Sequence, residues 1–196
     1  MEQKTISLVA RAHRRRLLEA MASSVALKGY AATTISDIVR EAGVSRRTFY
    51  EQFATRSDCL IALYEAASER ALTVLRSALD RQRPWQPQLE QVLEAYLDSL
   101  ATNPALLRTL YVEIWGLGVP GLAARRRVNQ DIADFMMTVI NEADAVPSLN
   151  IDMALAVVGG VNELILLAIE QGRAANLAQI AATCAALVRA VSASTR

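Results

Sequence analysis

Residues 34–53 read TISDIVREAGVSRRTFYEQF, and this stretch decides the fold of the N-terminal part of the chain. Thr34 and Asp37 have the spacing of a capping box, in which a hydroxyl and a carboxylate three residues apart bond the free N–H groups at a helix start. Gly43 permits the left-handed conformation that a sharp turn needs. Ser45 is a suitable N-cap for a second short helix. The stretch therefore predicts a helix-turn-helix, two short helices joined by a glycine turn.

The two short helices divide their side chains between a buried and an exposed face. The residues that can pack the helices together are apolar, namely Ile38, Val39, Val44 and Phe49. The residues left on the outer face of the second helix are polar, namely Arg46, Arg47, Thr48, Tyr50 and Gln52. Arginine, threonine and glutamine side chains can hydrogen-bond base edges or phosphates in the major groove of DNA. The pattern favours DNA binding, and the alternative is an αα-hairpin with a solvated arginine face.

Helical periodicity extends outward from this stretch over the rest of the chain, and no segment keeps the alternating pattern of a strand. We predict further helices over about residues 11–28, 55–78, 87–102, 104–114, 122–143, 151–171 and 176–191. Thr55 and Asp58 form a second capping box, and Asn176 is a possible cap for the last helix. The sequence GLGVPG at 116–121 predicts a loop, and Gly159-Gly160 allows two helices to approach closely. The predicted fold class is all-α, with about nine helices.

Composition and charge set broader limits on the chain. It has 196 residues, 53% of them hydrophobic, which predicts one or two ordered domains and excludes a disordered chain. No apolar run reaches the ~20 residues that span a bilayer, and the first ten residues lack a secretory signal. Residues 1–60 hold ten basic and six acidic side chains, whereas residues 61–196 hold eleven and fourteen. We therefore expect a soluble cytoplasmic protein whose excess positive charge lies in its N-terminal part. A cluster of arginines there could form a basic arm that reaches DNA, or a solvated helix end; its members are Arg11, Arg14, Arg15 and Arg16.

Enzymatic and metal-binding functions find little support in the sequence. His13 is the only histidine, which excludes a histidine triad or a multi-histidine metal site within one chain. Cys59 and Cys184 have no metal-ligand spacing, and Cys184 lies on an apolar helical stripe. No phosphate-binding glycine motif accompanies the glycine pair at 159–160. We predict that the protein is not an enzyme, with no catalytic residue, no metal and no cofactor.

Residues from about 11 to 65 resemble the DNA-binding domain of the tetracycline-repressor (TetR) family of bacterial transcription regulators. The motifs that carry the resemblance are Leu17-Leu18-Glu19-Ala20, Gly29-Tyr30, Thr33-Thr34-Ile35-Ser36-Asp37-Ile38-Val39, Glu41-Ala42-Gly43-Val44-Ser45, Thr48-Phe49-Tyr50, Phe53, and Arg56-Ser57-Asp58 with Leu60. The resemblance implies an N-terminal three-helix helix-turn-helix DNA-binding domain, residues 1–56, joined to a C-terminal helical ligand-binding and dimerisation domain, residues 57–196. For the second domain the resemblance rests on helix number and layout.

The resemblance also implies DNA contacts at matching positions. Thr34 would contact a phosphate, and Ser45 would cap the recognition helix and touch the DNA backbone. Tyr50 resembles a family tyrosine whose hydroxyl bonds a phosphate. Arg56 stands where the family usually has lysine, which keeps the charge but replaces a point charge by a planar fork. Base edges or nearby phosphates would be faced by Arg46, Arg47 and Thr48.

Two further sets of residues are candidates in the second domain. Family members pair their last two helices with the same helices of a second copy. The resemblance therefore implies a dimer interface here, and the candidate residues are Leu155, Val158, Gly159, Leu166, Leu177, Ile180, Cys184, Leu187 and Val191. The alternative is that these side chains fill the subunit's own core. Ligand cavities are mostly apolar with a few polar groups, and the candidates for such a cavity are Tyr96, Leu100, Leu107, Leu110, Tyr111, Glu113, Ile114, Trp115, Phe135, Met136, Ile140 and Asn162. Ordinary core or surface use is the alternative for each of them.

The function implied by the resemblance is that of a ligand-responsive transcription regulator. A homodimer would bind a palindromic operator in double-stranded DNA, repress transcription, and be released by a small, lipophilic effector. It would act in the cytoplasm, associated with the nucleoid when bound to DNA, without a membrane partner. The alternatives are an activator or a regulator of the same family controlled by a protein partner, and a helical interaction module that does not bind DNA.

Overall fold

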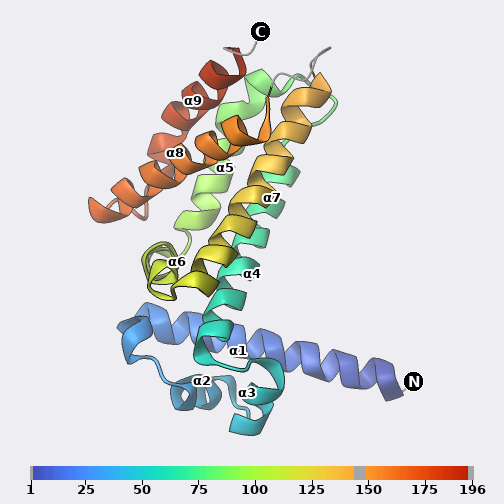
Figure 1. Ribbon diagram of the computed structural model, residues 1–196, viewed down its shortest axis with the longest axis vertical. Helices are drawn as coiled ribbons and strands as arrows, with labels where there is room; N and C mark the ends of the chain where they lie inside the picture. The colour runs from blue at the N-terminus through green and yellow to red at the C-terminus, as the bar shows by residue number, and fades with distance from the viewer. Residues whose placement is uncertain (1, 144–148, 194–196) are drawn as a thin grey trace. The chain divides into compact units, whose positions relative to one another are not determined.

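The computed structural model describes residues 2–143 and 149–193, which form nine α-helices and one short 3₁₀ helix (Figure 1). Those residues contain no strand, so the predicted all-α fold is confirmed. The chain divides into two compact units, one of Met1–Ala66 with Arg108–Ala124 and one of Ala67–Leu107 with Arg125–Arg196. The predicted division into domains 1–56 and 57–196 concerns function and stays a prediction.

The first unit contains the helix-turn-helix. The helices that form and support it are α1 (Glu2–Ala32), α2 (Ile35–Ala42), α3 (Arg46–Gln52) and the first part of α4 (Arg56–Ala78). The unit also includes the parts of later helices within Arg108–Ala124. Helices α2 and α3 pack against each other and against α1, as Figure 1 shows. The fully buried side chains at the centre of this unit come from all four helices, and they include Leu17, Met21, Val25, Ile38, Phe49 and Leu60. Of the residues predicted to pack the two short helices together, Ile38 and Phe49 are fully buried, whereas Val39 and Val44 are half-buried.

Helix α1 is longer than predicted at its N-terminal end. It begins at Glu2 rather than near residue 11, because residues 2–10 contain neither glycine nor proline that would stop a helix. Near its other end, Gly29 has φ 76°, a left-handed conformation that interrupts the helical backbone. The regular helix predicted to end near residue 28 is therefore interrupted at Gly29, and one further short stretch to Ala32 is helical.

The predicted loop at residues 116–121 is wrong in length. Helix α6 (Pro104–Gly116) and helix α7 (Val119–Ala143) are separated only by Leu117 and Gly118. Gly118 makes the turn with φ 64°, and Pro120 is tolerated in the first turn of α7. At Gly121 an added Cβ would lie 2.1 Å from the carbonyl oxygen of Ile114, so this glycine allows α7 to touch α6. The glycines and the proline of this stretch serve a tight helix–helix corner.

The second unit is built around α5 (Trp85–Ala101), α8 (Ile151–Glu170) and α9 (Ala181–Ala193), with the 3₁₀ helix η1 (Leu177–Ile180) before α9. Helix α5 packs against α9 and η1, and α8 packs against α9. The predicted cap at Asn176 is wrong, because its side chain makes no capping hydrogen bond and η1 intervenes. Gly160 lies against Leu187 of α9, since an added Cβ would be 3.0 Å from its Cδ2 atom. That contact explains one of the two adjacent glycines as a site of close helix approach.

Candidate DNA-binding surface and ligand cavity

The N-terminus of α2 is fixed by a network centred on Asp37. Thr34 caps the helix, its Oγ1 accepting the Asp37 N–H at 3.2 Å, while the Thr34 N–H donates to Asp37 Oδ2 at 2.9 Å. Lys28 at the end of α1 donates to the same carboxylate at 2.7 Å, and Arg40 donates to its other oxygen at 2.9 Å. The hydrogen bonds from Lys28 and Thr34 hold the pKa of Asp37 well below its ordinary value. The predicted capping box is confirmed, and Lys28 is a linking residue that the sequence pattern did not reveal.

The turn and the start of α3 follow the predicted geometry. Gly43 adopts φ 59° and ψ 42°, and its N–H donates back to the carbonyl of Arg40. Ser45 caps α3 by accepting the N–H of Thr48 at 3.0 Å. Phe49 is completely buried and packs its ring edge-to-face with Tyr50, with centroids 5.6 Å apart. Burial of Phe49 therefore fixes the rotation of α3 about its axis.

That rotation decides which side chains of α3 face outward. Arg46 and Arg47 are exposed, Tyr50 is 53% exposed, and Thr48 is half-buried. Arg47 forms an ion pair with Glu51 at 3.0 Å, on the surface of the same helix. Three of the residues predicted to face DNA, Arg46, Arg47 and Tyr50, are therefore exposed on the short second helix.

Arg56 occupies a different environment from the other predicted DNA-binding residues. Its guanidinium lies over the ring of Tyr30, 4.2 Å from the centroid, and donates to the carbonyl oxygen of Thr33. The Tyr30 hydroxyl in turn bonds Ser57 Oγ at 3.0 Å. Arg56 therefore ties the start of α4 to the end of α1, and its charge is engaged inside the unit.

Two arginines of the predicted basic arm also hold the helix-turn-helix rather than extending from it. Arg16 donates to the carbonyl of Gly43 at 3.0 Å, at the C-terminus of α2. Arg14 donates to the carbonyl of Gln52 at 3.5 Å and lies 4.5 Å from the ring centroid of Phe53, at the C-terminus of α3. Cations at helix C-termini are favourable because they meet the negative end of the helix dipole. Long-range contacts of this kind have no local sequence signal, which is why the pattern predicted an arm.

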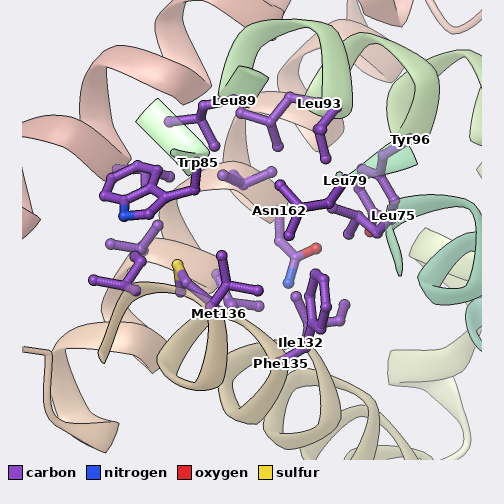
Figure 2. A pocket seen from close by; sticks show the side chains of 17 residues that line it. Leu75, Leu79, Trp85, Leu89, Leu93, Tyr96, Ile132, Phe135, Met136 and Asn162 are labelled. Atoms are coloured by element: carbon purple, nitrogen blue, oxygen red, sulfur yellow. The ribbon is translucent and has the colours of Figure 1, made fainter. Parts of the chain in front are cut away.

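The second unit encloses an apolar cavity of about 90 Å³. Figure 2 shows the 17 side chains that line it, which come from α4, α5, α7, α8 and α9 and from Leu79, directly after α4. None of them is charged, and the polar groups among them belong to Trp85, Tyr96 and Asn162. The Asn162 amide donates to Asn129 Oδ1 at 3.1 Å. The arrangement can hold a small apolar molecule and offers few hydrogen-bonding groups to orient it.

The structure brings five of the predicted ligand-binding residues into this cavity, namely Tyr96, Phe135, Met136, Ile140 and Asn162. The other seven do not line it, namely Leu100, Leu107, Leu110, Tyr111, Glu113, Ile114 and Trp115. Residues from Arg108 onward in α6 belong to the first compact unit, whereas the cavity is lined by the second. The prediction missed the other twelve lining residues. Among them are Leu75, which lies on the apolar stripe of α4, and Trp85, in the first turn of α5.

The predicted dimer residues divide into two groups by burial. Within the single chain, the core already contains Val158, Leu177, Ile180 and Cys184. Burial raises the pKa of the Cys184 thiol to about 11, as expected for a packing residue. The half-buried residues, which keep surface available to a second copy, are Leu155, Gly159, Leu166, Leu187 and Val191. The alternative of a core role therefore holds for the first group.

Helix α8 is unusually apolar for a helix with so much exposed surface. Among the described residues it is the only helix long and apolar enough to cross a membrane, with a mean hydropathy of 1.8 over an 18-residue window of which 33% is buried. Leu167 on this helix is 44% exposed. Length and composition alone do not distinguish a membrane span from a helix that packs against other protein. What α8 shows is apolar side chains, such as Leu167, on the surface of the second unit.

These features define a class of protein, a helical regulator with a helix-turn-helix in one unit and an apolar cavity in the other. Residues 17–63 match the sequence model of bacterial regulatory proteins of the tetR family. No curated protein matches the chain. The part of the chain that carries the helix-turn-helix therefore matches the TetR family, a family of non-enzymatic transcription factors that bind DNA.

Solved structures show how far the fold is shared. The transcriptional regulator FadR from Bacillus subtilis, in complex with stearoyl-CoA, has a TM-score of 0.70 and 17% identity over 89% of this chain and 96% of its own. A TetR transcriptional regulator from Rhodococcus sp. RHA1 has a TM-score of 0.68 and 17% identity over 92% and 96%. The multidrug binding protein EbrR, complexed with imidazole, has a TM-score of 0.66 and 21% identity over 91% and 93%. At these identities the similarity concerns the fold.

Proposed function

We propose that this DNA-binding regulator is a cytoplasmic repressor that binds a palindromic operator as a homodimer and is released by a small apolar effector. The observation that carries the proposal is the outward face of α3, held in place by the buried Phe49 and presenting Arg46, Arg47 and Tyr50. Arginine can bond a guanine with two hydrogen bonds in the major groove. Thr48 would read a base edge, while Tyr50, Thr34 and Ser45 would bond phosphates.

The dimer would form through the exposed apolar side chains of α8 and α9. The half-buried and exposed residues on these helices include Leu155, Leu166, Leu167, Leu187 and Val191. A helix-turn-helix dimer reads two half-sites about one helical turn or a multiple of it apart. Pairing of two copies through this surface would bury apolar area and set the spacing of the two α3 helices.

The apolar cavity supports the effector part of the proposal. Fourteen of its lining side chains carry no polar group, and a cavity of about 90 Å³ is smaller than the engineered cavity of about 150 Å³ that admits benzene. An effector larger than a few heavy atoms must therefore displace lining side chains, for which the flexible Met136 is suited. The FadR and EbrR structures that resemble this chain hold stearoyl-CoA and imidazole, respectively.

Displacement of the side chains that line the cavity could couple effector binding to DNA binding. Leu75 and Leu79 line the cavity, and Leu75 belongs to α4, the same continuous helix that begins at Arg56. Arg56 in turn holds Tyr30 and Thr33 at the end of α1. An effector that shifts α4 would thereby favour one placement of the helix-turn-helix. By linkage, operator DNA would weaken effector binding by the same factor.

Fluorescence anisotropy of a labelled operator, obtained by selection from random duplex DNA, tests the proposal. An effector should weaken operator binding to the wild-type protein. Val161→Phe, which fills part of the cavity, should keep operator binding but lose the response to the effector. Val119→Phe is the matched control, because Val119 is 80% exposed and outside the cavity. An effector response that survives Val161→Phe would place the effector elsewhere and contradict the proposal.

A further inference from the structure

Trp85 carries a buried polar group that the fold leaves without a hydrogen-bond partner. Its side chain is only 6% exposed, and its indole N–H meets no acceptor. Within the described ranges, 2–143 and 149–193, it is the one buried side-chain nitrogen or oxygen of this kind. Burying a donor without an acceptor opposes folding, because the bond to water is lost and nothing replaces it. Tryptophans in protein interiors usually satisfy this group.

The tryptophan forms part of the wall of the apolar cavity. Figure 2 shows its indole ring at one end of the lined space, with Leu75 and Tyr96 at the opposite end. Together with Leu79 and Val139, Trp85 also lines an adjoining cleft of about 180 Å³. The charged side chains of that cleft are Asp80, Arg81, Arg83 and Glu142. Trp85 therefore stands between an apolar compartment and a polar one.

For an acceptor that approaches this N–H from the cavity, the lining restricts the chemistry of the acceptor. A carboxylate would lose its hydration in the cavity, because none of the 17 lining residues is charged. The adjoining cleft offers it no net positive charge, because its two basic side chains are balanced by Asp80 and Glu142. Tyr96 and Asn162, the other polar residues of the lining, already interact within the protein. A neutral carbonyl oxygen is a good acceptor and costs far less to bury than an ion.

We propose that the effector is an apolar molecule with a neutral carbonyl group, whose oxygen accepts the hydrogen bond of the Trp85 indole N–H while its hydrocarbon part occupies the cavity. The proposal rests on the proposed function, in which this cavity is the effector site. Ketones, esters and amides belong to this class, whereas alkanes, alkenes and free carboxylates do not.

Three small probes of similar shape separate these classes. 2-Pentanone carries the carbonyl group, 2-methyl-1-pentene replaces its oxygen by a CH₂ group, and butyrate replaces its methyl group by a charged oxygen. The chain has two tryptophans, Trp85 and the 47% exposed Trp115, so a ¹⁵N-correlated NMR spectrum shows two indole N–H signals. Trp115→Phe assigns them without touching the cavity. We expect 2-pentanone to shift the Trp85 indole proton downfield, and 2-methyl-1-pentene to leave it without that shift.

Dissociation constants of the probes for the wild-type protein and for Trp85→Phe complete the test. Ketone and alkene differ in their own hydration, so the informative quantity is the effect of the substitution on each. We expect Trp85→Phe to weaken 2-pentanone binding about three- to tenfold and to leave 2-methyl-1-pentene binding nearly unchanged. Butyrate should bind at least about tenfold more weakly than 2-pentanone to the wild-type protein.

Several results would overturn the carbonyl proposal. These are equal losses for ketone and alkene in Trp85→Phe, no downfield shift with the ketone, equal binding of butyrate and 2-pentanone, or no binding of the ketone. If Trp85→Phe does not fold, the indole shift in the wild-type protein still decides the matter. The ketone could bind with the expected shift while no cavity-bound probe changes operator affinity. That result would contradict the proposed release mechanism, but it would still support the carbonyl-binding site.

Discussion

At the scale of single residues, the first unit separates side chains that face outward from side chains that hold the fold. Tyr50 is 53% exposed on α3, and its ring packs at nearly a right angle to the ring of the buried Phe49. Arg14 and Arg16 point back toward the carbonyls at the ends of α3 and α2. The two groups should respond differently to substitution, the first in DNA binding and the second in stability.

Tyr50→Phe should weaken operator binding about three- to tenfold for all operator sequences, because it removes the phosphate hydrogen bond proposed for the Tyr50 hydroxyl and keeps the ring packing. Thr48→Ala should instead change which base pairs are preferred, since Thr48 is assigned to a base edge. Selection of random duplex DNA with each variant measures both effects. If Tyr50→Phe altered the preferred sequence and Thr48→Ala did not, the two assignments would have to be exchanged.

Arg16→Gln should lower the free energy of unfolding by about 0.5–1 kcal/mol, because it removes a charged donor from the Gly43 carbonyl at a solvent-accessible helix end. Arg15→Gln is the matched control, since Arg15 has only a 3.7 Å surface ion pair with Glu19. Urea unfolding measures both variants. Equal effects of the two substitutions would show that the bond to Gly43 contributes nothing specific.

At the scale of elements, short-range capping fixes where the helices of the first unit begin. The hydroxyl–carboxylate pairs Thr34–Asp37 and Thr55–Asp58 both form the reciprocal hydrogen bonds of a capping box. Their bonds join residues three apart, which is why the sequence predicts them. The Asp37 carboxylate also receives Lys28 from α1, so the cap doubles as a contact between helices.

The Asp37 network makes stability depend on acid pH. A carboxyl group whose pKa is lower in the folded than in the unfolded chain stabilises the fold above its unfolded value, about 3.9, and loses this contribution as pH falls toward the folded value. Asp37→Asn should therefore lower the free energy of unfolding at pH 7 and reduce its fall between pH 5 and pH 3. Urea unfolding at these pH values measures the difference. If the free energy of unfolding fell equally in the wild-type protein and in Asp37→Asn, Asp37 would not contribute to the loss of stability in acid.

The corner between α6 and α7 depends on one glycine. Gly121→Ala should lower the free energy of unfolding by about 1–3 kcal/mol, because its Cβ would overlap the carbonyl oxygen of Ile114. Gly116→Ala is the control, since a Cβ there meets nothing within 4 Å and alanine favours the helix. Thermal unfolding of both variants measures the contrast. A harmless Gly121→Ala would mean that the two helices separate easily.

Local signals predicted some elements and failed for others. The caps at Thr34, Ser45 and Thr55 and the turn at Gly43 follow from neighbouring residues, and the structure confirms them. The cavity joins residues of α4, α5, α7, α8 and α9 that lie far apart in the chain, so periodicity could not show which apolar residues meet there. The same reason applies to Arg14 and Arg16, whose partners are distant in sequence.

At the scale of the whole molecule, charge and apolar volume are divided along the chain. The first sixty residues have an excess of basic side chains, and the remaining residues have an excess of acidic ones. The cavity lies wholly in the second unit, and the helix-turn-helix lies in the first. This division suits a protein in which DNA and a small effector occupy separate sites coupled through the chain.

Operator binding should weaken steeply with salt, because Lys and Arg release counterions from the phosphates they contact. Arg46→Ala should reduce the slope of log K against log salt by about one if Arg46 neutralises a phosphate, and it should leave the slope unchanged if Arg46 reads only a base. Anisotropy titrations at several salt concentrations measure the slope. A slope near zero for the wild-type protein would contradict the phosphate contacts assigned to α2 and α3.

The central claim, that the protein reads DNA sequence as a dimer, is tested most directly by selection of randomised duplex DNA with the purified wild-type protein at moderate salt. The proposed function predicts enrichment of an inverted repeat whose half-sites lie about one helical turn or more apart. The half-site spacing would give the distance between the two α3 helices in the bound dimer. No enrichment by folded, dimeric protein would contradict the claim and favour a helical interaction module.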